Sequence, residues 1–394
     1  MKLTIQREVL LKPLQQVVGV VERRQTLPIL GNVLINATKK GVKLTATDLE
    51  VELQTQMNVT VVDVGDCTLP ARKLLDICRA LPEGAEIDIT VKDDRATIRS
   101  GKSRFTLSTM PASEFPVVDK IKSANSFQVA QNELRSLIER TAFSMAQQDV
   151  RYYLNGLMLE PTRGLLRAVA TDGHRLALCE YAVGIGEGEL QQVIVPRKGV
   201  QELHRLLEDD EKPIQVDIGS NHIRITTGEL RFTSKLIDGR FPDYHRVIPK
   251  AADKRLTVKR ELLRQALTRT SILSNEKYRG IRLDISKNNV KIQAHNPDQE
   301  EAVEEIEVNY ENDPLLIGFN VTYLLDVLAA INADEVEIML SDANSSALIY
   351  KPGTTDCRYV VMPMRRSSFF FRVPYYPGIS GLIISDGRYR AVIA

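Results

Sequence analysis

The sequence has no tryptophan, only four cysteines and no long apolar run. Because a membrane-spanning helix needs roughly 18 to 20 consecutive apolar residues, no such helix is expected. The cysteines show no Cys-x-x-Cys spacing and no neighbouring histidine ladder; they are Cys67, Cys78, Cys179 and Cys357. This pattern indicates neither a zinc site nor a disulfide framework, and it favours reduced, buried thiols.

The sequence also has no large excess of basic or of acidic residues. The chain has 52 basic and 51 acidic residues, for a net charge of +1. This balance does not support a generally basic nucleic-acid binder. Any DNA-binding surface must therefore arise from charges that the fold segregates.

What is present is the composition of a folded protein, with 43% hydrophobic and 26% charged residues over 394 positions. This composition excludes disorder and a collagen-like fibre, and the length suits two or three domains. Residues 1–8 alternate apolar and polar side chains with early charges, which is typical of a strand and unlike a signal peptide. We therefore expect a cytoplasmic protein.

An internal repeat organises the chain. An apolar strand leading into a polar turn occurs around Thr47, Thr171 and His295, and each marker lies 124 positions after the one before. Similarity at a fixed spacing indicates repeated structural units. This spacing far exceeds the roughly 20 to 50 residues of solenoid repeats, so we interpret the units as true domains.

Two further markers recur in each unit. A strand ends and a helix begins at Leu69-Pro70, Val195-Pro196 and Phe319-Asn320. Apolar residues then follow at i, i+3, i+4 and i+7, which predicts a buried helical stripe; in the first unit they are Leu74, Ile77, Cys78 and Leu81. Each unit also opens with an amphipathic stretch, a short polar break and an alternating strand, in residues 10–37, 134–160 and 262–286.

The repeated pattern predicts an α+β fold, with two helices packed on antiparallel sheets in each of three tandem units. Alternating segments such as residues 212–227 are typical of antiparallel hairpins. Segments rich in Pro, Lys or Asp near 116–126 and 249–253 are typical of linkers. We therefore expect domains at 1–120, 121–249 and 250–365, followed by a tail at 366–394.

The string most suggestive of catalysis is Thr171-Asp172-Gly173-His174-Arg175, in which a carboxylate and an imidazole lie close together. Asp172 and His174 could support base catalysis in a hydrolase, or half of a metal site. The repeat counterparts at 47–50 and 295–298 keep the turn and lack the equivalent histidine. Since no Walker loop, nucleophile elbow or dinucleotide fingerprint accompanies the string, we favour a hydrogen-bonded turn and no enzyme.

Several long strings, in the same order, resemble the signatures of the bacterial DNA sliding clamps, the beta subunits of DNA polymerase III. The resemblance runs from Met1 to about Arg365. The strings are residues 25–32 (QTLPILGN), 149–156 (DVRYYLNG), 170–176 (ATDGHRL), 238–244 (DGRFPDY) and 359–365 (YVVMPMR).

The resemblance implies three tandem clamp domains and a head-to-tail homodimer that closes into a ring, with helices lining the hole and sheets outside. Duplex DNA would thread the hole. The expected role is that of a processivity factor without catalytic activity or cofactor. The implied partners are double-stranded DNA, a second copy of the chain, the replicative polymerase, the clamp loader and other proteins with a clamp-binding motif; no membrane is expected.

The resemblance also implies a set of DNA contacts. Phosphate contacts are independent of base sequence, as a sliding ring requires. The implied residues are Arg24, Arg72, Gln148, Tyr152 and Tyr153, with Lys198 as a weaker candidate. Taken alone, the basic pairs at 72–73 and 197–198 would be solvated helix faces, and the adjacent tyrosines a strand with one ring buried and one exposed.

Ring closure requires a heterologous interface whose rotation closes. The resemblance places Ile272 and Leu273 of the third domain against Phe105 and Leu107 on a strand of the first. Rim charges could pair around this apolar centre; they are Lys102 and Arg104 on one side and Glu300, Glu301 and Glu304 on the other. The alternative is that Ile272 and Leu273 are ordinary core residues.

Partner proteins of this family insert a short peptide with apolar anchors into a cleft between the second and third domains. Methionine suits such a cleft because its flexible side chain repacks around different partners. The implied walls are Leu154, Thr171, Gly173, His174, Arg175, Leu176, Pro242, Arg246, Val247, Tyr278, Asn320, Tyr323, Ser346, Val360, Met362, Pro363, Met364 and Arg365. Without the resemblance, Met362 and Met364 would be core residues and His174 a turn histidine.

A three-domain scaffold that binds proteins but no DNA is a further alternative. Charge segregation distinguishes it from a clamp. If Arg24, Arg72 and Lys198 did not face one concave surface, the DNA-binding interpretation would fail.

The chain departs from the family pattern after Arg365. Residues 366–394 hold six of the 22 aromatic residues and continue none of the three markers. A frame change, a cloning remnant or a genuine extension would each explain this tail. We hypothesise that residues 369–371 fold back over the peptide cleft and weaken partner binding. Equal peptide affinities for the full chain and for a chain ending at Arg365 would contradict this.

Overall fold

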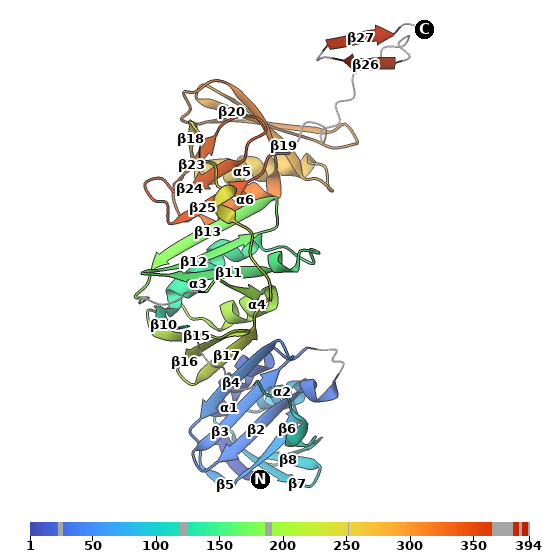
Figure 1. The fold of residues 1–394 in the computed structure, drawn as a ribbon. Coiled ribbons are helices and arrows are strands. Elements are labelled where there is room, and N and C mark those ends of the chain that lie inside the picture. Colours follow the sequence, from blue (N-terminus) through green and yellow to red (C-terminus); the bar gives the residue numbers. More distant parts are fainter. Residues whose placement is uncertain are drawn as a thin grey trace.

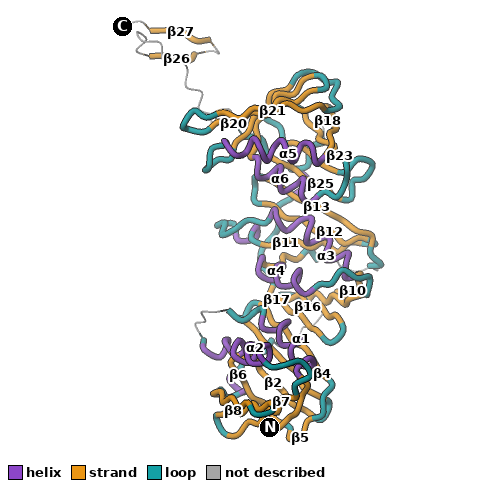
Figure 2. The backbone as a smooth tube through the Cα atoms, turned by 180° about the vertical axis from the view of Figure 1, so that it is seen from behind, coloured by secondary structure: helices purple, strands orange, loops and turns teal. Residues whose placement is uncertain are grey.

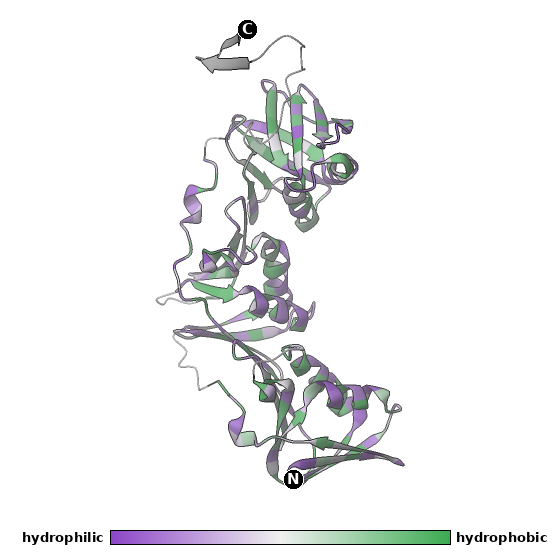
Figure 3. Ribbon diagram, turned by 90° about the vertical axis from the view of Figure 1, so that its right-hand side faces the viewer, coloured by the Kyte–Doolittle hydropathy of each residue, from purple (hydrophilic) through white to green (hydrophobic). Residues whose placement is uncertain are grey.

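The computed structural model describes residues 1–22, 27–118, 125–185, 191–250 and 252–364, and the backbone of two strands in the tail. Three similar domains follow one another along an elongated molecule (Figure 1). Seen from behind, the helices lie in front of the sheets (Figure 2). Figure 3 shows the domains along a shallow arc with the helices on its inner side.

In its described residues, the first domain contains two α-helices, two short 3₁₀ turns and nine strands. The helices are α1 (Arg7–Val18) and α2 (Ala71–Ala80), and the 3₁₀ turns are η1 (Pro28–Gly31) and η2 (Ala112–Glu114). The strands are β1 (Lys2–Gln6), β2 (Asn32–Thr38), β3 (Gly41–Thr47), β4 (Val51–Met57), β5 (Val61–Asp63), β6 (Gly65–Pro70), β7 (Glu86–Lys92), β8 (Arg95–Ser100) and β9 (Ser103–Ser108).

The second domain repeats this order, without a counterpart of β5 among its described residues. Its helices are α3 (Gln131–Thr141) and α4 (Arg197–Leu206), and its 3₁₀ turns are η3 (Ala142–Ser144) and η4 (Tyr152–Leu154), with η5 (Tyr244–Arg246) in the connection to the third domain. The strands are β10 (Asn125–Ala130), β11 (Gly156–Thr162), β12 (Leu165–Thr171), β13 (Arg175–Ala182), β14 (Val193–Pro196), β15 (Pro213–Ile218), β16 (His222–Thr227) and β17 (Leu230–Lys235).

The third domain has the same arrangement. Its helices are α5 (Arg260–Thr270) and α6 (Val321–Ala330), with the 3₁₀ turn η6 (Ser271–Leu273). The strands are β18 (Lys254–Lys259), β19 (Gly280–Ser286), β20 (Asn289–His295), β21 (Glu301–Glu307), β22 (Leu315–Asn320), β23 (Glu335–Leu340), β24 (Ala347–Tyr350) and β25 (Cys357–Val361). In the tail, β26 (Gly381–Ser385) pairs with β27 (Arg388–Val392).

Two of the sheets cross from one domain into the next. An eight-stranded sheet has the order β10-β15-β16-β17-β4-β3-β2-β6 and joins the first and second domains. A second, β14-β11-β12-β13-β25-β24-β23-β18, joins the second and third. The contacts at these junctions are antiparallel pairings of β4 with β17 and of β13 with β25. Backbone hydrogen bonds therefore continue across each junction between domains.

Apart from the two-stranded sheet in the tail, two further sheets lie in the first and third domains. One has the order β5-β1-β7-β8-β9 and the other β21-β20-β19-β22. Within the described residues, β9 pairs only with β8 and β21 only with β20. By their place in the repeat, β9 corresponds to β17 and β25, and β21 corresponds to β4 and β13. β9 in the first domain and β21 in the third thus correspond to the two strands that pair at each internal junction.

The sequence-based elements are confirmed. Of the predicted stripe, Leu74 and Cys78 on α2 are fully buried and Leu81 just after it nearly so, whereas Ile77 is only partly buried. The hairpin at 212–227 is β15 and β16. The repeated polar turn is also confirmed. The carboxylate of Asp172 accepts the backbone N–H groups of His174 and Arg175 at 2.9 and 3.0 Å. None of the helices in the described segments is long and apolar enough to span a membrane.

One expectation about the cysteines is wrong. Cys67 and Cys78 are unpaired and buried, as expected, whereas Cys179 and Cys357 form a disulfide. They lie 178 positions apart in sequence and directly opposite each other on β13 and β25. The expectation rested on local spacing, which carries no information about two strands from different domains.

Candidate DNA-facing, junction and partner-binding sites

Two of the basic residues expected at DNA lie on the helical side of the molecule. Arg72 begins α2 with an exposed side chain, and its guanidinium donates to the backbone carbonyl of Val21. Lys198 lies in the first turn of α4, a helix on the same side of the molecule as α2 (Figure 2). Arg24 lies outside the described residues. Arg72 and Lys198 therefore lie in the first turns of two helices on one side of the molecule, and their contact with DNA stays a prediction.

Lys198 is engaged differently from Arg72. Its ammonium pairs with Asp48 and Glu22, both of the first domain, and only 30% of its side chain is exposed. Although burial opposes the charged form, these carboxylates outweigh it and raise the pKa of Lys198. Lys198 thus bridges the first and second domains, and part of its charge is already neutralised.

The loop between α3 and β11 carries the other expected DNA contacts. Gln148 is exposed and has a positive φ of 55°. Tyr152 and Tyr153 lie in η4 in an edge-to-face arrangement, with their ring centroids 5.8 Å apart and their ring planes at 69°. Tyr152 is 57% exposed, whereas Tyr153 packs partly against an apolar cluster. The alternative of a strand is wrong, although its division into one more buried and one more exposed ring is correct.

Arg151 ties this loop to the turn at 171–175. Its guanidinium pairs with Asp149 at 2.8 Å and reaches the backbone carbonyl of Asp172 at 3.4 Å. The hydrogen bond from Arg151 lowers the pKa of Asp149 to about 2. Arg151 was not among the expected site residues, because its exposed charge resembles any other in the sequence.

The Asp172 carboxylate is committed to holding the turn. Besides accepting two backbone N–H groups, it pairs with Arg175 at 3.1 Å. The ring of His174 stacks on that of Tyr323, with centroids 6.4 Å apart. No group of three or more potential metal ligands occurs among the described residues. This geometry gives the hydrolase alternative no support.

The expected closure residues lie at the two free edges, one set at β9 of the first domain and the other near β21 of the third. Phe105 and Leu107 are half-buried on one face of β9 and pack against the core. In η6, Ile272 is 74% exposed, which contradicts the alternative that it is ordinary core, while Leu273 is partly exposed. Glu304 on β21 already pairs with Arg269 of its own chain at 2.6 Å. Lys102 just before β9 and Arg104 on it are exposed, as are Glu300 just before β21 and Glu301 at its start.

An internal junction shows how such edges meet. Where β13 pairs with β25, Phe143 of η3 lies with its ring centroid 6.0 Å from that of Tyr359. Since η3 follows α3 as η6 follows α5, Phe143 is the counterpart of the Ile272-Leu273 segment. Tyr359 is the counterpart of Phe105. The contact between Phe143 and Tyr359 was not predicted from the sequence, although the positions of both residues in the repeat were a usable signal.

The expected cleft residues fall into two groups. The first is an apolar cluster on the sheet that joins the second and third domains, with Leu176 and Val360 paired across the junction and Val247 packed against them. Pro242 and Arg246 are exposed in the connection nearby, whereas Leu154 is only 2% exposed.

The second group surrounds the end of β25. The backbone N–H of Met362 donates to the carbonyl of His174, and that of Met364 donates to the carbonyl of Gly318. A pocket here is lined by Asn344, Met362, Pro363 and Met364. The other expected residues of this group are Thr171, Gly173, Tyr278, Asn320, Tyr323 and Ser346; Arg365 lies outside the described residues.

Arg175 holds the two groups together. It pairs with Asp172 and with Asp326 of α6, donates to the carbonyl of Phe143 at 2.8 Å, and lies 4.5 Å from the ring centre of Tyr323. Only 11% of its side chain is exposed. One arginine of the second domain therefore fixes the position of a helix of the third. Asp326 was not expected at the site, because nothing in its sequence neighbourhood marks it.

Family models match the chain along almost all of residues 1–365. They describe the N-terminal, central and C-terminal domains of the DNA polymerase III beta subunit, at residues 1–119, 128–243 and 245–365. The chain belongs to the DNA polymerase III beta subunit family. It is therefore a sliding clamp, a non-catalytic processivity subunit of DNA polymerase III.

Individual clamps are similar over the same span. The beta sliding clamps of Pseudomonas putida and Escherichia coli are 57% and 52% identical over 366 residues, which is 93% of this chain and 100% of each relative. A crystal structure of the DNA polymerase III subunit beta from Pseudomonas aeruginosa has a TM-score of 0.91 at 55% identity. A solved structure of Caulobacter crescentus pol III beta has a TM-score of 0.89 at 40% identity. Each covers 93% of this chain and 100% of the solved one.

Proposed function

We propose that two copies of this sliding clamp join head to tail into a closed ring, with the helices lining the hole through which duplex DNA passes. The pair of unmatched edges, β9 at one end and β21 at the other, carries this proposal. Each is half of the antiparallel pairing that already joins the domains within the chain. Exposed strand edges favour such pairing because their backbone groups lack partners.

The internal junctions supply the expected register. Aromatic residues recur 127 positions apart at Phe105, Phe232 and Tyr359. Phe232 lies opposite Leu53 at the first junction, and Tyr359 lies opposite Ala177 at the second. Leu53 and Ala177 occupy equivalent positions in the hairpins that contain the repeated turn. In the third such hairpin the equivalent position, on β21, is Ala302.

It follows that Phe105 lies opposite Ala302 of the second copy, and Thr106 opposite Glu301. In this arrangement Ile272 and Leu273 cover the aromatic ring, as Phe143 covers Tyr359. The charges Lys102 and Arg104 come close to the acidic strand, where Glu300 and Glu301 offer carboxylates. Because Glu304 pairs with Arg269, we rank it below the other two as a partner.

The DNA contacts proposed are Arg24, Arg72, Gln148, Tyr152 and Tyr153, with Lys198 as a lesser one because of its two carboxylate partners. Exposed guanidinium and amide groups suit phosphate oxygens, which are the same at every base pair. The exposed ring of Tyr152 can stack on an unpaired base where duplex meets single strand.

We further propose that the cleft between the second and third domains takes a short peptide with apolar anchors, from the replicative polymerase, the clamp loader and other proteins that share the motif. The apolar cluster around Leu176 and Val360 suits one anchor, and the pocket at Met362 and Met364 suits another. We infer that such a clamp acts in the cytoplasm. We retain 1–120, 121–249 and 250–365 as domain limits, with 366–394 as a separate tail.

Cross-linking tests the closure. Thr106→Cys combined with Glu301→Cys should yield a covalently closed dimer under mild oxidation, because directly opposite residues of antiparallel strands can form a disulfide. The matched control is Thr106→Cys with Val303→Cys, which shifts one partner by two positions on the same face and should cross-link far less. Equal yields would contradict the register, and no covalent dimer in either would contradict the pairing of these edges.

A further inference from the structure

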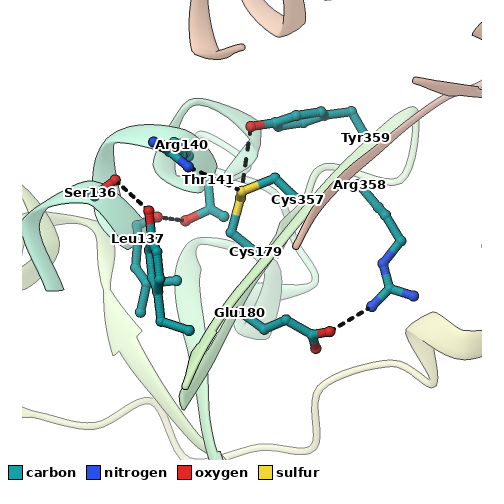
Figure 4. The surroundings of a disulfide bond; sticks show 10 residues. Ser136, Leu137, Arg140, Thr141, Cys179, Glu180, Cys357, Arg358 and Tyr359 are labelled. Carbon is teal, nitrogen blue, oxygen red and sulfur yellow. Dashed lines mark hydrogen bonds and ion pairs between the residues drawn. A yellow bond between two sulfur atoms is a disulfide. The ribbon is translucent and has the colours of Figure 1, made fainter. Parts of the chain in front are cut away.

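We propose that Cys179 and Cys357 form a thiol–disulfide modification site that locks the second and third domains together beneath the partner-binding cleft. The bond joins β13 to β25, whose pairing is the junction between these domains (Figure 4). The two Cα atoms are 4.1 Å apart. The effect on partner binding, unlike the bond itself, rests on the function proposed for the cleft.

The bond lies on the strands that carry the cleft. Three register positions separate it from the Leu176–Val360 pair of the apolar cluster. Beyond β25 the chain is held by the N–H groups of Met362 and Met364, which donate to carbonyls of the second and third domains. If β25 leaves β13, the cleft walls lose their relative position. A covalent bond between these strands prevents that separation.

The surroundings of the pair suit reversible chemistry. Cys179 is fully buried, whereas Cys357 is only partly buried, so an external thiol would approach the bond from the Cys357 side. The guanidinium of Arg140 lies 3.9 Å from the Cys357 sulfur, and the Tyr359 hydroxyl lies 3.7 Å from that of Cys179 (Figure 4). A neighbouring cation favours the thiolate, which is the reactive and leaving form of cysteine.

The unpaired cysteines are different. Burial raises the pKa of the Cys67 thiol to about 12 and that of the Cys78 thiol to about 11. Both therefore stay protonated and inert at neutral pH. They serve as internal controls for the reactivity of the pair.

Glutathione disulfide is the oxidant and the glutathione thiol is the reductant. In reduction, a glutathione thiolate attacks the Cys357 sulfur, the protein disulfide breaks, and Cys179 leaves as a thiolate that takes up a proton. A second glutathione thiolate then attacks the glutathione sulfur of the mixed disulfide and releases the Cys357 thiolate beside Arg140. Two glutathione thiols become one glutathione disulfide, and the protein gains two thiols; oxidation is the reverse. In reducing compartments, disulfides of this kind are commonly redox-sensing.

The first test needs only the full chain. After treatment with glutathione disulfide, alkylation under denaturing conditions should find two free thiols, and after dithiothreitol four. Hydrogen exchange of the β25 amides should be at least about tenfold slower in the oxidised form, because local separation of β25 from β13 is blocked. Cys357→Ala should abolish both responses, and Cys67→Ala should retain them. Four thiols after oxidation, or equal β25 exchange in both forms, would overturn the proposal.

The second test measures a fluorescent peptide carrying the clamp-binding segment of the polymerase. The oxidised protein should bind it at least about threefold more tightly than the reduced one, since a cleft already ordered loses less entropy on binding. Cys357→Ala should bind equally in both conditions. Equal affinity of the unsubstituted chain in both forms would refute the link to the cleft. Absence of binding in either form would contradict the proposed cleft instead, while the thiol and exchange results still decide the modification.

Discussion

The ring of Phe143 lies with its centroid 6.0 Å from that of Tyr359, across the junction of the second and third domains. This contact accompanies the pairing of β13 with β25, so backbone hydrogen bonds and an apolar contact act together. At the ends of the chain the counterparts, Ile272 and Phe105, are 74% exposed and half-buried. The internal junction thus shows the backbone hydrogen bonds and the apolar contact that the two ends of a single chain lack and that a second copy would supply.

The apolar centre of this interface can be removed. Ile272→Ala combined with Leu273→Ala should shift the protein from dimer to monomer in light scattering at low micromolar concentration. Truncating a buried aliphatic side chain costs about 2 to 5 kcal/mol, which is more than tenfold in affinity for each copy. Leu262→Ala, on the exposed side of α5, is the control and should remain dimeric. A persistent dimer of the double variant would refute the assignment of these residues.

The salt dependence of DNA affinity should reveal which residues contact phosphates. Arg72→Ala should weaken binding to duplex DNA similarly for all sequences. It should also lower the slope of log affinity against log salt by about 1 for each phosphate that Arg72 neutralises. Lys39→Ala, in the exposed turn between β2 and β3, is the matched control and should leave the slope unchanged. Fluorescence anisotropy at several salt concentrations measures both, and an unchanged slope for Arg72→Ala would remove it from the DNA contacts.

Arg175 should matter for the architecture of the cleft. Arg175→Ala leaves Asp172 and Asp326 without their partner and removes the cation from the ring of Tyr323. The expected loss is about 1 to 3 kcal/mol in unfolding free energy, together with weaker peptide binding. Arg246→Ala is the stability control, because its side chain is 86% exposed and its pair with Asp243 should contribute no more than about 0.5 kcal/mol. Equal stability of the two variants in denaturant titrations would contradict the role of Arg175.

The repeat allowed much of this fold to be predicted. Helical stripes, hairpins and turn hydrogen bonds depend on neighbours in sequence, so Leu74, Cys78 and Asp172 behave as expected. What could not be predicted depends on pairing between domains. The disulfide of Cys179 and Cys357 and the ion pair of Arg175 with Asp326 join residues more than a hundred positions apart. Local pattern contains no information about such partners.

Glu52 gives the junction of the first and second domains a pH dependence. Its side chain is 1% exposed on β4, opposite Thr233 of β17. Burial raises its pKa, although the Val118 N–H and nearby basic groups, Arg224, Lys43 and Arg231, oppose the shift.

A carboxyl group whose pKa is raised by folding lowers stability as pH rises from its ordinary value of 4.5 through the folded value. Glu52→Gln removes this effect. The variant should melt at a higher temperature than the unsubstituted chain at neutral pH, and the difference should shrink as pH falls toward 4.5. Exposed Glu50→Gln is the control. A difference between Glu52→Gln and the parent that does not change with pH in calorimetry would contradict this.

The central claim is that the protein encircles DNA, and release from a cut circle tests it most directly. The clamp is loaded on closed circular duplex, the circle is cut once, and the protein that remains on DNA is measured by gel filtration. A closed ring holds the circle by topology and slides off the ends, so retention should be high before the cut and absent after it. Retention that is equal on circular and cut DNA would show binding to the surface of the duplex and contradict the account.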